Sequence, residues 1–280
     1  MNILYVKPEE VGEKQIQVIS PEDIRHLSKV LRVKAGDMLP VSDGSEWEYV
    51  GRIEEISEYG IVLSIVDKQK HGRELSYHVE LFQGVPKSPK LELIVRKSVE
   101  LGASAITPVY MDRCVNKPSG REDKKRGRLQ KIADEAVKQC LSPRNPIVNE
   151  YTAFNDALNV LPDFDLVIFP YENEENKTLK DLLTNDFLRP KDRHILDKSN
   201  DSETSSESEY FIKSNDEAKI LKADIPKIAV IIGPEGGFST KEVEKLRSLG
   251  IRPVSLGKSI LRTETAGPAT LAMLMYEFEL

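Results

Sequence analysis

The 280-residue sequence contains little cysteine, little histidine and no long apolar run. Its two cysteines, Cys114 and Cys140, are too few and too widely spaced for a zinc site, so we interpret them as free thiols. The four histidines show no metal-ligand spacing, and we therefore expect no metal. No stretch of about eighteen apolar residues occurs, which predicts no membrane span. Since Met1–Tyr5 leads directly into charge, we also expect no signal peptide and a cytoplasmic protein.

What is present fits a globular chain long enough for two domains. The net charge of -6 argues, over the whole chain, against a nucleic-acid partner. Residues 113–131 reverse that inference, because they hold eight Lys or Arg against two acids, a pattern typical of phosphate binding. The acidity comes largely from elsewhere: residues 201–209 carry four acids, four serines and no base. They lie in a low-complexity acidic insertion at about 189–224, which we interpret as a solvated loop.

The C-terminal part alternates apolar runs with glycine-containing loops. The continuous run Ile228–Ile232 predicts a strand of a parallel sheet covered on both faces. Loops follow at Gly233–Gly237, at Gly257 and at Ser259–Pro268, and a second strand at Arg252–Leu256 lies between the first two. Parallel sheets bind ligands at the carboxyl ends of their strands, and glycine lets a ligand approach the backbone. We therefore expect the loops to converge on one binding site.

Two helices are predicted in the same part of the chain. Ser239 and the glutamate three residues later form a capping box, which predicts a helix start. The run Ala269–Tyr276 is apolar nearly all round and predicts a last helix buried in the domain or against a second subunit. Because proline is tolerated only in a first helical turn, Pro268 predicts a start capped by Thr265 and not by Thr263.

Residues 1–72 predict a small β-rich domain that contains one helix. Ser20-Pro21 marks the start of this helix and Gly36 its end. Its inward stripe is predicted to consist of Ile24, Leu27 and Leu31. Strands are expected at 38–41, 47–56 and 61–66, the first two joined by an Asp-Gly hairpin.

Residues 73–280 predict a second, α/β domain. Strands at 78–82 and 105–109 flank a helix from Ser88 to Leu101, and this alternation is typical of a parallel sheet. A helix at 129–141, a buried strand at 165–169 and a short helix at 179–183 follow.

The C-terminal motifs resemble the SPOUT, or α/β-knot, methyltransferases, and most closely their RsmE family. The resemblance rests on Gly-Pro-Glu-Gly-Gly at 233–237, on Leu256-Gly257, and on Ile-Leu-Arg-x-Glu-Thr-Ala at 260–266. Further matches are His-Leu-x-x-Val-Leu-Arg at 26–32 and the pattern from Pro86-Lys87 to Gly102. The segment around Gln139 and Arg144 matches only loosely.

The resemblance implies an α/β fold whose parallel sheet carries a deep C-terminal trefoil knot, preceded by a PUA-like β-barrel that binds RNA. It implies methylation of N3 of a specific uridine in 16S ribosomal RNA of the small subunit, with S-adenosylmethionine as the methyl donor. It also implies a homodimer that pairs through the last helix. The alternatives are a SPOUT enzyme acting on transfer RNA or a ribose 2'-OH, and a non-enzymatic RNA-binding or ribosome-assembly factor.

Candidate site residues follow from the same matches. Those for the cofactor are Ile232, Gly233, Pro234, Glu235, Gly236, Gly237, Leu256, Gly257, Ile260, Leu261, Arg262, Thr265 and Ala266. Those for RNA, drawn from the basic segments as well, are Arg25, Lys29, Arg32, Lys87, Arg121, Lys124, Lys125, Arg126 and Arg128. Lys90 either faces RNA phosphates or lies on a solvated helix face.

The catalytic candidates are Arg262 and Glu264. Uracil N3 must lose a proton as it accepts a methyl group, so negative charge develops on the ring oxygens. A fixed guanidinium would stabilise that charge, which is the role we predict for Arg262. Glu264 acts as the base, orients Arg262, or forms a structural salt bridge or cap.

Overall fold

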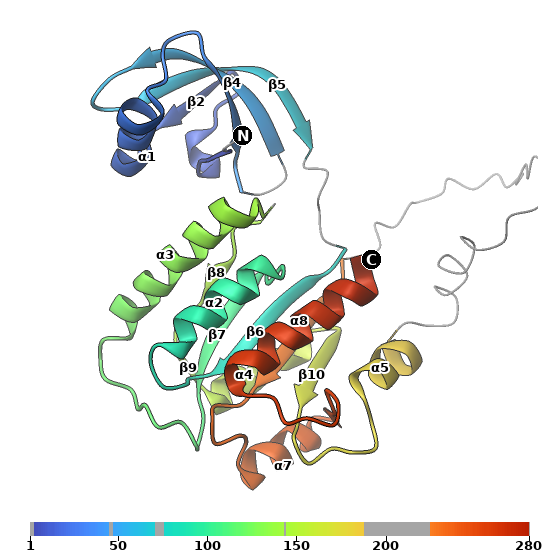
Figure 1. Ribbon diagram of the computed structural model, residues 1–280. Coiled ribbons are helices and arrows are strands. Elements are labelled where there is room, and N and C mark those ends of the chain that lie inside the picture. Colours follow the sequence, from blue (N-terminus) through green and yellow to red (C-terminus); the bar gives the residue numbers. More distant parts are fainter. Residues whose placement is uncertain (1–2, 45–46, 71–75, 143, 188–224, 280) are drawn as a thin grey trace, which may run out of the picture.

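The computed structural model describes residues 3–44, 47–70, 76–142, 144–187 and 225–279 (Figure 1). The predicted boundary at 72/73 and the acidic insertion at 189–224 lie outside the described residues. The strands are β1 Leu4–Tyr5, β2 Gln15–Val18, β3 Met38–Ser42, β4 Trp47–Ile56, β5 Ile61–Lys70, β6 His78–Gly84, β7 Ala105–Tyr110, β8 Ile147–Val148, β9 Thr152–Ala153, β10 Leu166–Pro170, β11 Lys227–Ile232 and β12 Pro253–Val254. The α-helices are α1 Pro21–Arg25, α2 Lys90–Glu100, α3 Glu122–Cys140, α4 Phe154–Val160, α5 Leu179–Asp181, α7 Thr240–Ser248 and α8 Thr263–Glu279. Shorter turns are the 3-10 helices η1 Pro8–Glu10 and η3 Leu161–Asp163, and the π-helices η2 His26–Leu31 and η4 Leu182–Phe187.

The N-terminal part forms a five-stranded sheet in the order β1-β3-β4-β5-β2. The long β4 and β5 pair antiparallel and carry register shifts at Val50/Gly51 and Ile53/Glu55, which bend the sheet. Its edge strands β1 and β2 do not pair with each other in the described residues, so this PUA-like sheet is a half-barrel. Its core includes Ile16, Ile53, Ile61 and Leu63.

The helix of this sheet begins as predicted but ends earlier. The Ser20 hydroxyl accepts a hydrogen bond from the Asp23 N–H and caps α1. The chain then continues as the π-helix η2, whose wider turn rotates the following side chains. Ile24 and Leu27 are buried, whereas Leu31 is 43% exposed, so its predicted place in the inward stripe is wrong. The helix ends at Leu31 and not at Gly36, because Arg32 adopts a left-handed conformation with φ of 55°.

The second sheet is parallel throughout, in the order β12-β10-β11-β6-β7-β8, and β9 also pairs with β7. Its central strands β11 and β6 are neighbours, although about 150 residues separate paired residues such as His78 and Lys227 in the sequence. The strand order reverses here, because β6 leads to β7 on one side while β11 pairs with β10 on the other.

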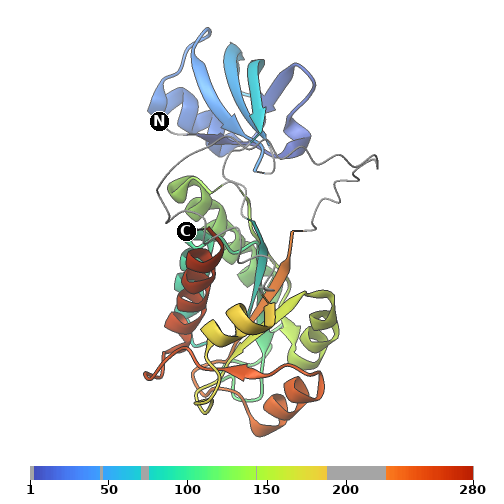
Figure 2. The same cartoon turned by 90° about the vertical axis from the view of Figure 1, so that its right-hand side faces the viewer.

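Helices cover both faces of this sheet (Figure 2). Helices α2, α3 and α8 pack on one face around buried residues such as Ile94, Leu129 and Leu271. Helices α4 and α7 pack on the other, with Phe154 and Leu246. The predicted buried side of α2, which comprises Leu91, Ile94, Val95 and Val99, is confirmed.

The capping box that predicts the start of α7 is present. The Ser239 hydroxyl accepts from the Glu242 N–H, and the Ser239 N–H donates to the Glu242 carboxylate at 2.7 Å. Helix α3 starts earlier than the predicted residue 129, because Glu122 anchors an additional N-terminal part. Its carboxylate accepts the Ser119 N–H at 2.7 Å and the Tyr110 hydroxyl at 2.9 Å, and these bonds lower the pKa of Glu122 to about 2.

The last helix begins at Thr263, so the prediction of a start capped by Thr265 is wrong. The Arg262 carbonyl accepts the N–H groups of Thr265 and Ala266, both at 2.8 Å, and Pro268 stands inside the helix. Pro268 cannot donate to the Glu264 carbonyl. The first turn is held from outside instead, since the Thr263 side chain bonds to Gln83 of β6 and to Gly233 in the loop after β11.

Polar contacts join the half-barrel to the α/β part. The Tyr5 hydroxyl donates to the Ser142 carbonyl at 3.2 Å, and Lys138 of α3 pairs with Asp23 of α1 at 3.0 Å. The Asn145 N–H donates to the Gly44 carbonyl at 3.2 Å. These contacts set α1 above one end of α3 (Figure 1).

Cys114 and Cys140 are free thiols, as predicted. None of the helices described here is long and apolar enough to cross a membrane. The described residues also hold no group of three or more His, Cys, Asp or Glu side chains placed to share a metal ion.

Candidate functional site

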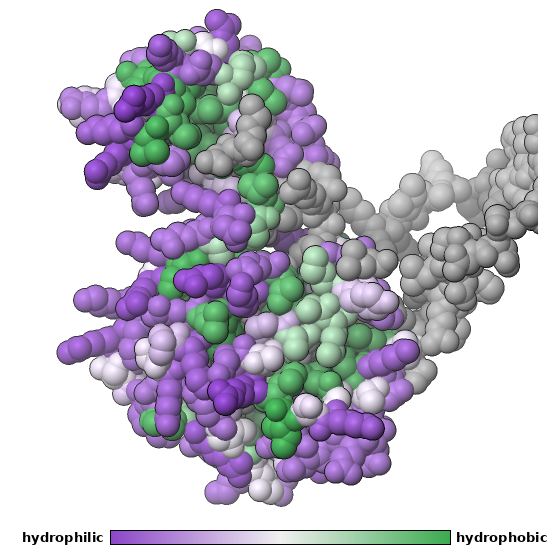
Figure 3. Space-filling view, in the orientation of Figure 1, coloured by the Kyte–Doolittle hydropathy of each residue, from purple (hydrophilic) through white to green (hydrophobic). Residues whose placement is uncertain are grey.

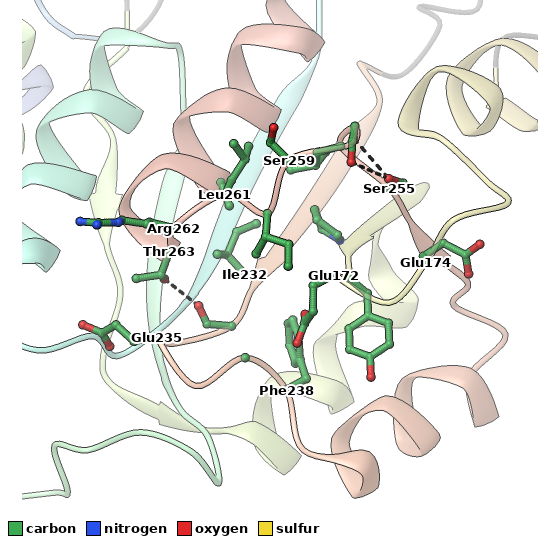
Figure 4. A pocket seen from close by; sticks show the side chains of 18 of the residues that line it. Glu172, Glu174, Ile232, Glu235, Phe238, Ser255, Ser259, Leu261, Arg262 and Thr263 are labelled. Carbon is green, nitrogen blue, oxygen red and sulfur yellow. Dashed lines mark hydrogen bonds between the residues drawn. The ribbon is translucent and has the colours of Figure 1, made fainter.

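A cavity of about 1120 Å³ lies at the carboxyl edge of the parallel sheet (Figure 4). Its walls are the loops that follow β10, β11 and β12, together with the start of α8. This is the edge at which α/β sheets bind ligands, and the predicted convergence of the C-terminal loops is what the structure shows.

Most of the predicted cofactor residues line this cavity. They are Ile232, Gly233, Pro234, Glu235, Gly236, Gly237, Leu256, Gly257, Ile260, Leu261, Arg262 and Ala266. Thr265 is exposed and does not line it. The two catalytic candidates, Arg262 and Glu264, are both brought to the cavity.

A buried chain of hydrogen bonds fixes the loop after β11 against α8. The Thr263 hydroxyl donates to the Gly233 carbonyl at 2.7 Å and accepts the Gln83 side-chain amide at 2.9 Å. The same amide nitrogen donates to the Gly84 carbonyl at 3.0 Å. Both side chains are buried. Because Thr263 follows Arg262 directly, these hydrogen bonds also fix the position of the Arg262 backbone.

The end of β6 approaches the loop after β11 very closely. A Cβ at Gly84 would lie 2.6 Å from the Pro234 nitrogen and 2.9 Å from the Gly233 carbonyl carbon. Since real Cβ atoms do not approach so closely, only glycine fits at this position. The Lys87 N–H then donates to the Glu235 carboxylate at 3.0 Å, which ties the loop after β6 to the same wall.

One lysine of α2 pairs with two glutamates of the cavity. The Lys90 ammonium lies 3.0 Å from the Glu264 carboxylate and 3.3 Å from that of Glu235. The bond to Glu264, followed by that to Glu235, raises the pKa of Lys90. The pKa of Glu264 is lowered by its own backbone N–H and by Lys90. Burial opposes ionisation of Glu235, but backbone N–H groups and Lys90 outweigh it and lower its pKa as well.

Arg262 presents a free cation beside these pairs. Within the described residues its exposed guanidinium makes no ion pair. In Figure 4 its side chain extends away from Ile232 and Leu261, toward the side on which Glu235 lies. The cavity therefore has a charged end formed by α2 and the start of α8, and a more apolar part around Ile232 and Leu261.

Two groups of lining residues were missed by the sequence-based assignment. Lys90 was expected at RNA phosphates or in solvent, yet it lies inside the cavity wall. The loop after β10 contributes Tyr171, Glu172 and Glu174. A signal existed for this loop, because its strand was predicted and the carboxyl ends of all parallel strands share one edge. No sequence signal gave the pairing of Lys90, which needs the contact between α2 and α8.

The predicted RNA residues lie on or next to three helical elements, α1, η2 and α3, and on one loop. Arg25, Lys29 and Arg32 are exposed on and next to α1 and η2, and Lys87 is exposed after β6. Arg121 and Lys124 are exposed at the start of α3, whereas Arg126 is half-buried. Two further cations have partners: Lys125 pairs with Glu122 at 3.8 Å and Arg128 with Glu92 at 2.9 Å. Figure 3 shows hydrophilic side chains along the margin formed by α1 and α3.

Comparison with known proteins assigns the chain to a class. A family model described as an RNA methyltransferase domain matches residues 73–196 and 193–275, and one described as an RNA methyltransferase PUA domain matches residues 19–66. This chain combines an α/β fold, a ligand cavity at the carboxyl edge of its sheet and the sequence of an RNA methyltransferase domain. Together these features define its class as that of the RNA methyltransferases. The chain belongs to this RNA methyltransferase family, and the predicted resemblance to the RsmE proteins is confirmed.

Named relatives extend over nearly the whole chain. A protein of Bacillus subtilis named ribosomal RNA small subunit methyltransferase E is 28% identical and covers 97% of this chain and 94% of its own. The protein of that name from Synechocystis is 29% identical over 97% of this chain and 76% of its own. A solved Legionella pneumophila methyltransferase, in complex with its cofactor SAM, is 25% identical with a TM-score of 0.72, covering 98% and 97% of the two chains. These similarities confirm the predicted fold class.

Proposed function

We propose that this protein transfers a methyl group from S-adenosylmethionine to N3 of a uridine in 16S ribosomal RNA of the small subunit. The observation that carries the proposal is the cavity, in which glycine-rich backbone meets a guanidinium without an ion pair in the described residues, at the carboxyl edge of the sheet. The names of the curated relatives support the substrate class.

The residues present fit the proposed cofactor. Leu256, Gly257 and Leu261 would hold the adenine through backbone groups, and Ile232 offers apolar surface beside them. Loop glycines leave the backbone open to close approach. When bound, the cofactor would supply an electrophilic methyl group on a sulfonium; the protein contributes position and electrostatics.

Arg262 is the proposed catalytic residue. The uracil ring would lie at the charged end of the cavity, where the free guanidinium could stabilise the negative charge that develops as N3 loses its proton. Because N3 takes part in Watson–Crick pairing, the target uridine must be unpaired when it enters.

For Glu264 we favour a positioning role over that of a base. A base works best with a pKa near the operating pH, whereas its own backbone N–H and the Lys90 ammonium move the pKa of Glu264 in the opposite direction. Lys90 of α2 pairs with Glu235 in the loop after β11 and with Glu264 in the first turn of α8. These three residues therefore join the three elements. We propose that this triad holds the site in shape while Arg262 acts on the substrate.

RNA is proposed to lie across α1, η2, the loop at Lys87 and the start of α3. The exposed cations on this path that form no ion pair within the described residues include Arg25, Lys29, Arg32, Lys87, Arg121 and Lys124. Arg128 and Lys125 already pair with carboxylates, so their contribution would require breaking an ion pair.

We also propose a homodimer formed through α8. Ala272, Met273 and Tyr276 are exposed on successive turns of this helix, and Figure 3 shows hydrophobic residues gathered over it. One face of the helix is thus buried in its own domain, whereas the other exposes apolar side chains. A second copy of the chain is a suitable partner for this exposed face.

Methyl transfer to isolated ribosomal subunits tests the function. Labelled S-adenosylmethionine is offered with small subunits that lack the modification, with large subunits, and with transfer RNA. We expect label in small-subunit RNA alone. Label in transfer RNA would favour the alternative SPOUT substrate, and no binding of the cofactor would favour a non-enzymatic RNA-binding factor.

A further inference from the structure

Glu172, in the loop after β10, extends into the cavity between Ile232 and Phe238 (Figure 4). We infer that this carboxylate is a specificity-determining residue, which makes the cavity prefer the positively charged methyl donor over the neutral demethylated product. The inference rests on the proposed function, because it names the part of the cofactor that one residue recognises.

The position of Glu172 is defined by its contact with the loop after β11. A Cβ at Gly237 would lie 2.7 Å from the Glu172 carboxylate oxygen, so the carboxylate covers this glycine. Gly237 has φ of 66°, a backbone conformation that residues with a side chain rarely adopt. Its lack of a Cβ therefore permits this conformation and also leaves space for the Glu172 carboxylate.

Among the residues that the structure describes, the carboxylate of Glu172 has no partner. Within the described part of the chain it accepts no hydrogen bond and forms no ion pair. Three of the other four acids of the cavity have partners: Glu235 and Glu264 pair with Lys90, and Glu174 accepts the N–H groups of Asn176 and Lys177. A ligand cation would thus be the first partner of Glu172.

The charge of the lining supports a cationic ligand. Five glutamates face three basic residues, which leaves a formal excess of two negative charges. They are Glu172, Glu174, Glu175, Glu235 and Glu264 against Lys90, Lys258 and Arg262.

The donor and the product differ in one charge. Both carry the amino-acid ammonium and carboxylate, but the donor also carries a sulfonium, which becomes a neutral thioether once the methyl group has left. A carboxylate near the sulfur therefore strengthens donor binding and leaves product binding nearly unchanged. Preference for the donor would assist product release.

Equilibrium binding separates this role from other contacts. Dissociation constants for S-adenosylmethionine, S-adenosylhomocysteine and an analogue with a protonated amine in place of the sulfonium are measured for wild type and Glu172→Gln by calorimetry. We expect the donor and the amine analogue to bind about three- to fivefold more weakly and the product to change little; the exposure of Glu172 limits the effect. Glu244→Gln on α7, exposed and outside the cavity, makes the same change of net charge and should alter none of the three.

An equal loss for all three ligands would overturn the inference, since it would place Glu172 at a part that donor and product share, such as the ribose. No change in any constant would overturn it as well. Failure of the wild type to bind the donor at all would instead count against the proposed function, and the inference would fall with it.

Discussion

Arg262 is the residue on which the proposed chemistry depends most. Its backbone carbonyl starts α8 and its neighbour Thr263 is locked to Gln83 and Gly233, so the guanidinium extends from a fixed point. Because the guanidinium has no ion pair in the described residues, truncating it leaves no unpaired carboxylate behind. Its removal should therefore affect chemistry more than folding.

We predict that Arg262→Ala keeps donor affinity within a few-fold and lowers the rate of methyl transfer about 100-fold or more, since a preorganised donor to a developing charge has effects of this order. Single-turnover transfer and calorimetric binding measure the two quantities. Arg96→Ala, an exposed arginine of α2 outside the cavity, is the matched control. Transfer near the wild-type rate would exclude the role.

The triad of Lys90, Glu235 and Glu264 predicts a stability that depends on pH. The pKa of Glu264 and of Glu235 is lowered in the folded protein, so their pairing with Lys90 contributes fully above the ordinary glutamate pKa of about 4.3. The contribution is lost as the pH falls through the lower, folded-state values. Thermal unfolding of wild type and Lys90→Met should differ at neutral pH, and the difference should vanish in acid. An exposed control, Arg96→Met, should show no such dependence.

Gly84 tests how tightly the cavity wall is built. A methyl group there would meet the Pro234 nitrogen at 2.6 Å, so Gly84→Ala should destabilise the fold by about 1–3 kcal/mol and weaken donor binding. Gly127→Ala is a control of opposite sign, because Gly127 lies inside α3 with open space around it and should stabilise by about 0.5–1 kcal/mol. Chemical denaturation measures both, and an unchanged Gly84→Ala protein would contradict the close approach.

At the scale of elements, helix α3 is the clearest candidate for phosphate contact. Arg121 and Lys124 are exposed at its start and make no ion pair in the described residues. Replacing both by alanine should weaken RNA binding and reduce the slope of log affinity against log salt by about 1.4 to 1.8, the value for two lost phosphate contacts.

Lys241 and Arg247 of α7, on the opposite face of the sheet, provide a double-alanine control with the same charge change. Binding measured across a salt series distinguishes the pairs. If the α3 variant kept the wild-type slope, the start of α3 would not touch RNA.

Elements whose signals are local were predicted correctly from the sequence. The capping box at Ser239 works within three residues, and the apolar stripe of α2 needs only its own periodicity. The errors have two causes. Thr263 starts α8 because the distant residues Gln83 and Gly233 bond to it, whereas Leu31 turns outward because a local π-helix changes the helical register.

The site follows the same division. Glycine-rich motifs such as residues 233–237 could be located from the sequence, because the glycines and the order of the motifs along the chain are visible there. Lys90 and Glu172 could not, since each matters only through contacts made across the fold. Thr265 was assigned with its neighbours, but its side of the helix turns away from the cavity.

At the scale of the whole molecule, the exposed face of α8 decides the assembly. Met273 is 39% and Tyr276 70% exposed on a helix whose other face is fully buried. We predict that Met273→Lys with Tyr276→Lys converts a dimer into a monomer, because two buried charges are too costly in an apolar interface.

Sedimentation of the purified protein measures the assembly state. Tyr59→Lys, at an 83% exposed position of the half-barrel, should leave the dimer intact. A wild type that sediments as a monomer at all concentrations would rule out α8 as a dimer interface.

The central claim joins fold, cavity and basic surface into one reaction, and the identity of the methylated nucleoside tests it most directly. Small ribosomal subunits lacking the modification are incubated with the protein and labelled S-adenosylmethionine, and the RNA is digested to nucleosides. Our account predicts that the label elutes as N3-methyluridine, and that Arg262→Ala incorporates it about 100-fold more slowly or slower still. Label in a 2'-O-methylated nucleoside or in another base would contradict it.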